Sequence, residues 1–160
     1  MRRILVILAA LVLLTGCGRL YTAETSLRID RSFHRPLEFR LQEEGPNLVL
    51  RTIIYSGMGG YQKEPSPVLS DNSRPLTPEE ATAVRSSLRA VLASSPTDLV
   101  NSSGRDGSMW LFTGSGFWPG RLKVWTPKAE AWLRGTQPLN DFGLLLWRLG
   151  KIDEPDKNFY

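Results

Sequence analysis

The sequence predicts an α+β fold in a single domain, with the element order β-β-α-β-β-α and one antiparallel sheet that carries both helices on one face. Three observations predict it: two pairs of stretches in which apolar and polar residues alternate, turn-forming residues within each pair, and a helical pattern after each pair. With 160 residues, of which 41% are hydrophobic, the chain can form one core without disulfides. The predicted strands are 37–42, 48–55, 108–113 and 121–126, and the predicted helices are 78–94 and 138–149.

The first strand pair is predicted to be a hairpin. Apolar residues alternate with charged or amide side chains over 37–42, which is the period of a strand with one face in a core. Turn residues fill Glu43–Asn47, and 48–55 resumes the alternation with β-branched and aromatic side chains. The glycines of Ser56–Gly60 follow. Because phosphate-loop spacing and a directly following helix are both missing, we interpret them as a connection.

The first helix has a well-marked beginning. Thr77 is predicted to be its N-cap, Pro78 its first residue, and Glu80 the partner that completes a capping box. Ser94-Ser95-Pro96 ends the helix. Between these ends the apolar residues recur at helical spacing and form one stripe for the core: Ala81, Val84, Leu88, Val91 and Leu92.

The second half of the chain has the same order of elements with different connections. Gly114–Gly120 is rich in turn formers and predicts a second hairpin. A short helical turn is expected within 126–135, and 138–149 closes the domain as a helix with Gly150 at the C′ position. Residues 153–160 are predicted to be a polar tail.

The N-terminal residues predict export and lipidation. Two arginines follow Met1, and Ile4–Leu14 is an apolar run that suits a signal-peptide core but is shorter than the roughly 20 residues of a spanning helix. The run ends in Leu14-Thr15-Gly16-Cys17, which resembles the lipobox of bacterial lipoprotein precursors. The resemblance implies that residues 1–16 are removed, that the Cys17 sulfur receives a diacylglyceryl group, and that the new amino group is acylated, for example with palmitate.

The same resemblance implies a location. Each buried methylene contributes about 0.8 kcal/mol, so two or three acyl chains on Cys17 make membrane attachment effectively permanent. Gly18 follows the cysteine, and in Gram-negative members of the family a residue other than Asp there implies the periplasmic face of the outer membrane. The alternative is an ordinary secretory signal that leaves Cys17 as a free thiol. The large Leu14, three residues before Cys17, argues against it.

We therefore expect four segments. They are a signal peptide at 1–16, the lipidated cysteine with a tether at 17–33, the α+β domain at 34–152, and the polar tail. The tether is expected to end at most in a short edge strand. Loss of the two arginines in the signal leaves 18 basic and 16 acidic residues, a formal charge of +2. This near-balance and the absence of a basic stripe argue against a nucleic-acid partner.

Few residues suit catalysis or metal binding. Cys17 and His34 are the sole residues of their types, which excludes zinc fingers, iron–sulfur clusters and an internal disulfide, and no cofactor or metal is predicted. His34 precedes a strand beside Arg35, which favours a surface position over a catalytic one. Four carboxylates are candidates for hydrolytic acids, and each also has a sufficient structural explanation: Glu43, Glu44, Asp106 and Asp141.

Aromatic residues supply the candidate binding site. Phe117 and Trp118 lie at the predicted tip of the second hairpin, where they have little to pack against. They either form a contact site for a protein, glycan or lipid surface, or fold back onto the domain. The stretch 84–149 also resembles small uncharacterised bacterial proteins with an Asp-Gly-x-x-Trp segment, here Asp106–Trp110, and a Trp-x-Pro segment, here Trp125–Pro127. That resemblance implies no activity.

The leading hypothesis is a lipid-anchored, non-enzymatic periplasmic protein that binds another envelope component through its sheet face or hairpin tip. A sharper form of it is an immunity or inhibitor lipoprotein that neutralises a secreted enzyme. The competing class is an envelope hydrolase that uses two carboxylates. That class predicts a concave pocket in which two acidic side chains lie about 5 to 9.5 Å apart.

Overall fold

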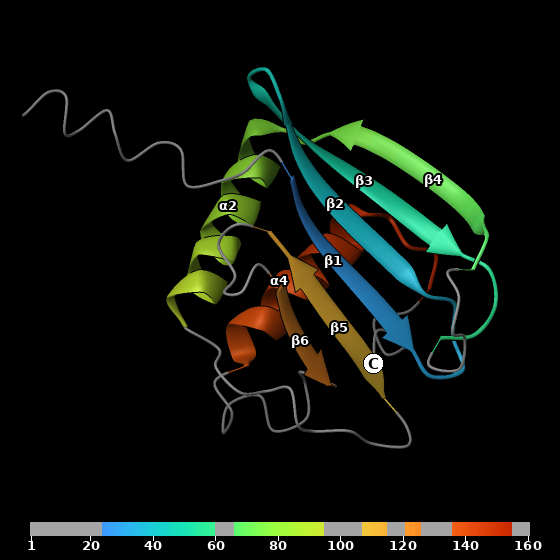
Figure 1. Ribbon diagram of the computed structural model, residues 1–160. Coiled ribbons are helices and arrows are strands. Elements are labelled where there is room, and N and C mark those ends of the chain that lie inside the picture. The colour runs from blue at the N-terminus through green and yellow to red at the C-terminus, as the bar shows by residue number, and fades with distance from the viewer. Residues whose placement is uncertain (1–23, 60–65, 95–106, 115–120, 126–135, 155–160) are drawn as a thin grey trace, which may run out of the picture.

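The computed structural model describes residues 24–59, 66–94, 107–114, 121–125 and 136–154, which form a six-stranded sheet and two helices (Figure 1). The elements are β1 (Glu24–Arg31), β2 (Leu37–Glu44), β3 (Asn47–Tyr55), β4 (Val68–Pro75), α2 (Pro78–Ala93), β5 (Ser108–Thr113), β6 (Arg121–Trp125) and α4 (Gln137–Leu149). The expected class, α+β with an antiparallel sheet and two helices, is confirmed. The expected order β-β-α-β-β-α is matched only in part: six of the elements follow it, but β1 and β4 are additional strands before the first helix.

β1 lies in the middle of the sheet, whose strand order is β4-β3-β2-β1-β5-β6 with antiparallel neighbours. Leu27 pairs with Phe39 of β2 on one side and with Phe112 of β5 on the other. This corrects the interpretation of the segment before residue 34 as a tether. At most a short edge strand was expected there, whereas β1 has eight residues and lies between two strands. Its buried face also carries the polar residues Thr25 and Arg31, so the apolar alternation in the sequence looks too short.

β4 is an edge strand that the apolar pattern did not predict. Its sequence, VLSDNSRP, is apolar only at its first two residues, and most of its side chains are exposed. Strand preferences of amino acids largely reflect packing on a half-buried surface, and β4 has little such surface. Its backbone hydrogen bonds to β3 are enough to hold this polar sequence as an edge strand. The pairing of β4 with β3 shifts register between Ile54 and Tyr55.

The predicted capping box of α2 is confirmed. The Glu80 amide donates to the Thr77 hydroxyl at 3.2 Å, and the Thr77 amide donates to the Glu80 carboxylate at 2.9 Å. Arg74 of β4 donates two hydrogen bonds to the same carboxylate, at 2.8 and 3.0 Å. Glu80 therefore fastens the beginning of α2 to the end of β4.

The end of α4 differs from its prediction. Gly150 was expected at C′ in a left-handed conformation, but it is the C-cap, with a φ of −71°, and Lys151 takes the left-handed conformation with a φ of 51°. A β-carbon on Gly150 would lie 2.7 Å from Phe39 Cε1 and 2.9 Å from Thr52 Oγ1. The glycine is therefore required by close approach to the sheet rather than by its φ angle.

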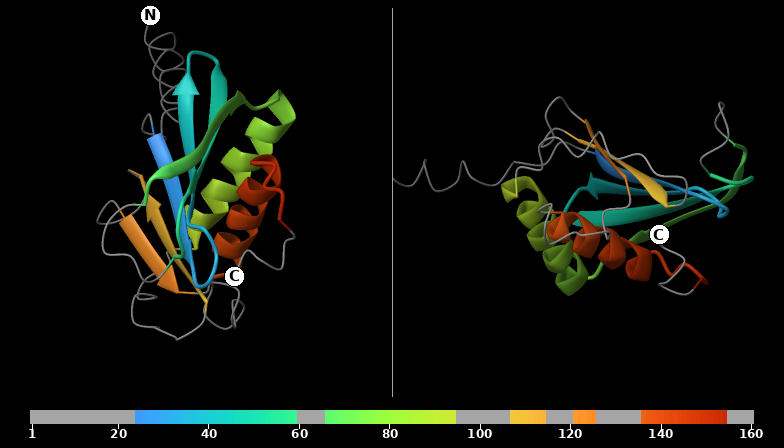
Figure 2. Two further views of the ribbon diagram at one scale, coloured as in Figure 1. Left: turned by 90° about the vertical axis from the view of Figure 1, so that its right-hand side faces the viewer. Right: turned by 90° about the horizontal axis from the view of Figure 1, so that it is seen from below.

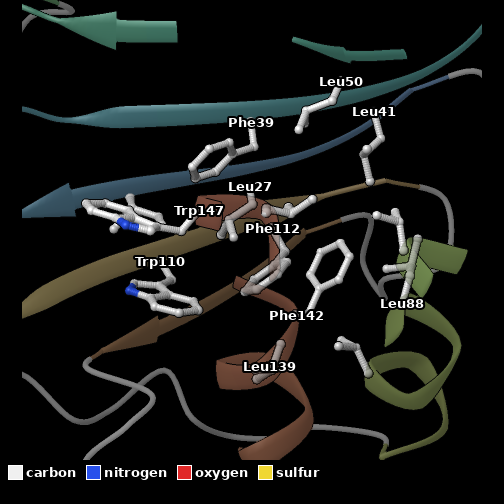
Figure 3. Close-up of a cluster of buried hydrophobic side chains, with 14 of the residues drawn as sticks. Leu27, Phe39, Leu41, Leu50, Leu88, Trp110, Phe112, Leu139, Phe142 and Trp147 are labelled. Atoms are coloured by element: carbon white, nitrogen blue, oxygen red, sulfur yellow. The ribbon is translucent and has the colours of Figure 1, made fainter. Parts of the chain in front are cut away.

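The core lies between the sheet and the two helices, which Figure 2 shows on the same face of the sheet. Alternate residues of β1, β2 and β3 point into it, together with the apolar stripes of α2 and α4. In Figure 3, Phe112 of β5 and Phe142 of α4 lie side by side, with ring centroids 6.1 Å apart. The buried Trp110 donates its indole N–H to the Ser108 hydroxyl at 2.8 Å, so its polar group is satisfied.

Acid should weaken the connection between β4 and α2. Arg74, and then the Thr77 amide, lower the pKa of Glu80 to about 2 from its usual 4.5. A depressed folded-state pKa means that the stabilisation is present above about pH 4.5 and is lost as the pH falls toward 2. Because the carboxylate is partly exposed, we expect it to contribute only about 1 kcal/mol.

Denaturant unfolding at pH 7 and pH 2 measures this contribution. Glu80→Gln should lower the free energy of unfolding at pH 7 and have little effect at pH 2, while Glu44→Gln, at the exposed hairpin turn, should have little effect at either pH. An equal loss for Glu80→Gln at both pH values would contradict the assignment.

Candidate functional site

A buried arginine ends the central strand. Arg31 has no exposed surface, and its Nη1 and Nη2 donate to the Glu154 carboxylate at 2.8 and 3.3 Å. Its Nε and Nη2 also donate to the Arg35 carbonyl oxygen at 3.1 and 2.7 Å, and the guanidinium lies 5.1 Å from the Trp147 ring centroid. Glu154 belongs to the expected polar tail 153–160, yet here it is bonded to the end of β1. Arg31 thus joins β1, the β1–β2 connection, α4 and the residues after α4.

The connections next to Arg31 are held against each other. Ser32 and Gly59 form an isolated parallel bridge, and the Gly59 amide donates to the His34 carbonyl oxygen at 2.9 Å. The Ser32 amide donates to the Gly107 carbonyl oxygen at 2.8 Å. A β-carbon on Gly59 would lie 2.4 Å from the Arg31 carbonyl oxygen, so no other residue fits there without displacing the backbone. One glycine of the segment Ser56–Gly60 is thereby explained by packing.

Four large apolar side chains are exposed at the same end of the sheet, where β1 and β3 end and β2 and β4 begin, on the right of Figure 1. We call them the apolar rim: Phe33, Met58, Val68 and Leu69. Phe33 is 62% exposed, Met58 58%, and the two β4 residues 53% each. An exposed apolar group of this kind is typical of a contact surface.

The backbone holds the apolar rim in unusual conformations. Phe33 has a φ of 63°, a left-handed conformation that costs a residue with a β-carbon about 1–2 kcal/mol. Met58 follows Gly57, whose φ is 82°. The register shift in β4 leaves Leu69 as an extra residue between Val68 and Ser70, which both have partners on β3. Phe33 is therefore both strained and exposed, where folding alone would favour a glycine or asparagine, and such a residue is typical of a functional constraint.

A charged network supports this end of the sheet from the face opposite the helices. Glu38 is buried there, and its carboxylate accepts hydrogen bonds from the Tyr55 hydroxyl and, at 2.6 Å, from Arg40 Nε. The Arg28 guanidinium lies 4.9 Å from the Tyr55 ring centroid. Burial, and then the hydrogen bond to Glu38, raise the pKa of Tyr55 above 10. The network fastens β1, β2 and β3 together beside the apolar rim.

The structure separates the candidate catalytic carboxylates. Glu43 lies 3.6 Å from Arg85 and, among the described residues, is the one carboxylate that lines a hollow of about 20 Å³ between the β2–β3 hairpin and α2. Glu44 is exposed, Asp141 accepts a hydrogen bond within the first turn of α4, and Asp106 lies outside the described residues. The described residues that line a larger hollow, of about 190 Å³, include no carboxylate.

The remaining candidate residues are placed as follows. His34 is half-buried in the β1–β2 connection, next to Phe33. Cys17, Phe117 and Trp118 lie outside the described residues. Within the described part of the chain, no group of three or more His, Cys, Asp or Glu side chains is placed to hold a metal ion. The described segments also include no helix whose length and hydropathy suit a membrane crossing.

Sequence reasoning missed the apolar rim. The sequence offered one signal for it: Met58 between two glycines and Phe33 before His34-Arg35-Pro36. Neither residue belongs to a stretch in which apolar residues recur at strand or helix spacing. The other two members of the apolar rim belong to β4, which was not predicted.

No protein-family model, curated protein or solved structure matches this chain.

Removal of the Glu38 charge should loosen the network. In Glu38→Gln we expect the pKa of Tyr55 to fall while staying above its usual value, because burial is the larger cause of the rise. The free energy of unfolding should fall by about 1–2 kcal/mol, because a buried charge-assisted hydrogen bond is lost. An NMR pH titration of the Tyr55 ring and denaturant unfolding measure the two effects. Asp71→Asn, which breaks the exposed pair with Arg51, is the control and should change neither quantity appreciably.

Proposed function

We propose that this protein is a lipid-anchored, non-enzymatic component of the bacterial envelope that binds another envelope protein through the apolar rim. The anchor is supported by the lipobox Leu14–Cys17 and the apolar run before it. The binding role is supported by one observation above all, the exposure of Phe33 in a strained backbone conformation, with Met58 brought near by the bridge between Ser32 and Gly59. In a Gram-negative cell, Gly18 favours the periplasmic face of the outer membrane.

The position of β1 supports this arrangement of anchor and rim. Glu24 begins β1 only seven residues after Cys17, and seven residues span at most about 25 Å. The end of the sheet where β1 begins would therefore stay within that distance of the lipid. β1 then runs for eight residues, about 26 Å at 3.3 Å per residue, toward the apolar rim (Figure 1). The rim would face away from the anchor, which favours a protein partner over the anchoring membrane itself.

The side chains of the rim suit a protein partner. Aromatic residues and methionine are enriched at the buried centres of protein interfaces. Methionine adapts its shape to a partner, whereas Phe33 is fixed by a backbone that is bridged to Gly59 through its neighbour Ser32. Phe33 would therefore fix the orientation of the partner protein, and Met58 would pack closely against its surface.

Replacement of the cysteine tests the anchor. Cys17→Ser should move the protein from the membrane fraction to the soluble or precursor fraction of its native host, because acyl chains can no longer be attached. Thr15→Ser keeps a small residue at that position and should stay in the membrane fraction. Equal membrane recovery of Cys17→Ser and wild type would refute the lipid anchor.

Photo-crosslinking in intact cells tests the rim. A photoreactive residue at position 58 should capture one dominant envelope protein, while the same residue at position 44, at the other end of the sheet, should not. Phe33→Asn should abolish the adduct and yet fold at least as stably as wild type, because asparagine tolerates the left-handed conformation. Phe33→Tyr should retain the adduct. Capture that is the same from both positions, or unaffected by Phe33→Asn, would contradict the proposal, and a captured hydrolase would specify the inhibitor form of it.

A further inference from the structure

A hollow of about 190 Å³ lies on the other side of the molecule from the charged network, between the β3–β4 pair and the end of α4. The strands form one wall, and Leu149, Gly150 and Lys151 form the other. A cavity of about 150 Å³ is large enough to hold benzene. This hollow therefore has room for a molecule of that size or slightly larger.

A buried hydroxyl group faces the hollow. Thr52 is only 5% exposed, and in the described part of the chain its hydroxyl has no hydrogen-bond partner. Every fully enclosed side-chain nitrogen or oxygen of the described, non-exposed residues does have a partner, so the Thr52 hydroxyl is reached from the hollow. The absence of a β-carbon at Gly150, which would lie 2.9 Å from this oxygen, keeps it accessible. The Thr52 hydroxyl is therefore available to hydrogen-bond a polar group of a molecule that enters the hollow.

The charged groups at the hollow leave one net positive charge. Arg74 lines it, but the guanidinium donates to Glu80 and to the carbonyl oxygens of Leu149 and Pro75, which uses its N–H groups. The charges of Arg74 and Glu80 offset each other. Lys151 also lines the hollow. It forms no ion pair within 4 Å with a described residue, but it lies near enough to Glu80 to contribute to the lowered pKa of that carboxyl. Arg74, Lys151 and Glu80 together carry one net positive charge.

The backbone of Lys151 gives a second reason to assign it a role. Its φ of 51° is left-handed, at a position after a helix where glycine or asparagine is usual. The negative end of the α4 dipole favours a cation there, but this at most offsets the cost of a β-carbon in the left-handed conformation. The helix end alone therefore does not explain the lysine.

We infer that this hollow binds a small organic monocarboxylate. The ammonium group of Lys151 and the hydroxyl of Thr52 receive the carboxylate, and Leu50 and Leu149 contact the apolar part of the molecule. One net positive charge matches one negative charge, which favours a monocarboxylate over inorganic phosphate. The inference does not depend on the apolar rim or on the lipid anchor.

An NMR titration of the full chain in detergent with sodium benzoate tests the inference. Benzoate should shift the amide signals of Thr52, Gly150 and Lys151 saturably, with a Kd of about 1 mM or lower. Benzyl alcohol, which has a similar shape without the charge, should bind about tenfold more weakly, and so should inorganic phosphate. Absence of saturable benzoate binding, or stronger binding of either comparison compound, would overturn the inference.

Charge-matched variants locate the site. Lys151→Gln should weaken benzoate binding about tenfold, because a charge-assisted hydrogen bond is lost. Lys123→Gln removes the same charge from β6, at the other edge of the sheet, and should bind like wild type. Thr52→Val, which replaces the hydroxyl with a methyl group, should weaken binding about fivefold. Equal affinities of the Lys151 and Lys123 variants would contradict the site.

Lys151→Gly separates binding from folding. Glycine adopts the left-handed conformation without strain, so this variant should unfold at the same denaturant concentration as wild type or at a higher one. Its benzoate affinity should nevertheless fall about tenfold, as in Lys151→Gln. Unchanged affinity in this stably folded variant would show that the lysine does not bind the ligand.

Discussion

The structure depends on the neutralisation of one buried cation at the end of its central strand. Arg31 has no contact with solvent, so its charge must be matched within the protein, and removal of a partner from such a group typically costs about 3–5 kcal/mol. Glu154 and the Arg35 carbonyl oxygen supply the match, and Trp147 covers the guanidinium. Residues 123 positions apart in the chain are thereby joined at the middle of the sheet.

This constraint explains why the exposed features lie where they do. Because Arg31 ties down the β1–β2 connection, Phe33 is held exposed in a strained conformation instead of folding back onto the core. Because Glu154 holds the chain after α4 to Arg31, the helix ends close against β3, and Gly150 and Lys151 are placed beside Thr52. One buried contact thus supports the apolar rim on one side and the hollow on the other.

The sequence predicts those parts of the fold whose signals are local. The capping box of α2, the β2–β3 hairpin and the bounds of β5 follow from neighbouring residues, and the structure confirms them. The full extent of β1 and the whole of β4 were not predicted, because their polar residues depend on partners far away in the sequence. The buried Arg31 of β1 is paired with Glu154, and β4 is held as an edge strand by its pairing with β3. The role of Gly150 depends on contacts with Phe39 and Thr52, roughly 100 residues away, and so does the hollow. The candidate residues Cys17, Phe117 and Trp118 remain predictions.

The proposed function rests on the proposed lipid at Cys17, because such an anchor would set both the compartment and the direction in which the apolar rim faces. Mass spectrometry of the N-terminal peptide, from protein purified out of its native host, measures this directly. The account predicts a mature chain that begins at Cys17, carries the mass of a diacylglyceryl thioether, and lacks residues 1–16. An unmodified Cys17 thiol, with the leader still attached or cut at another position, would contradict it.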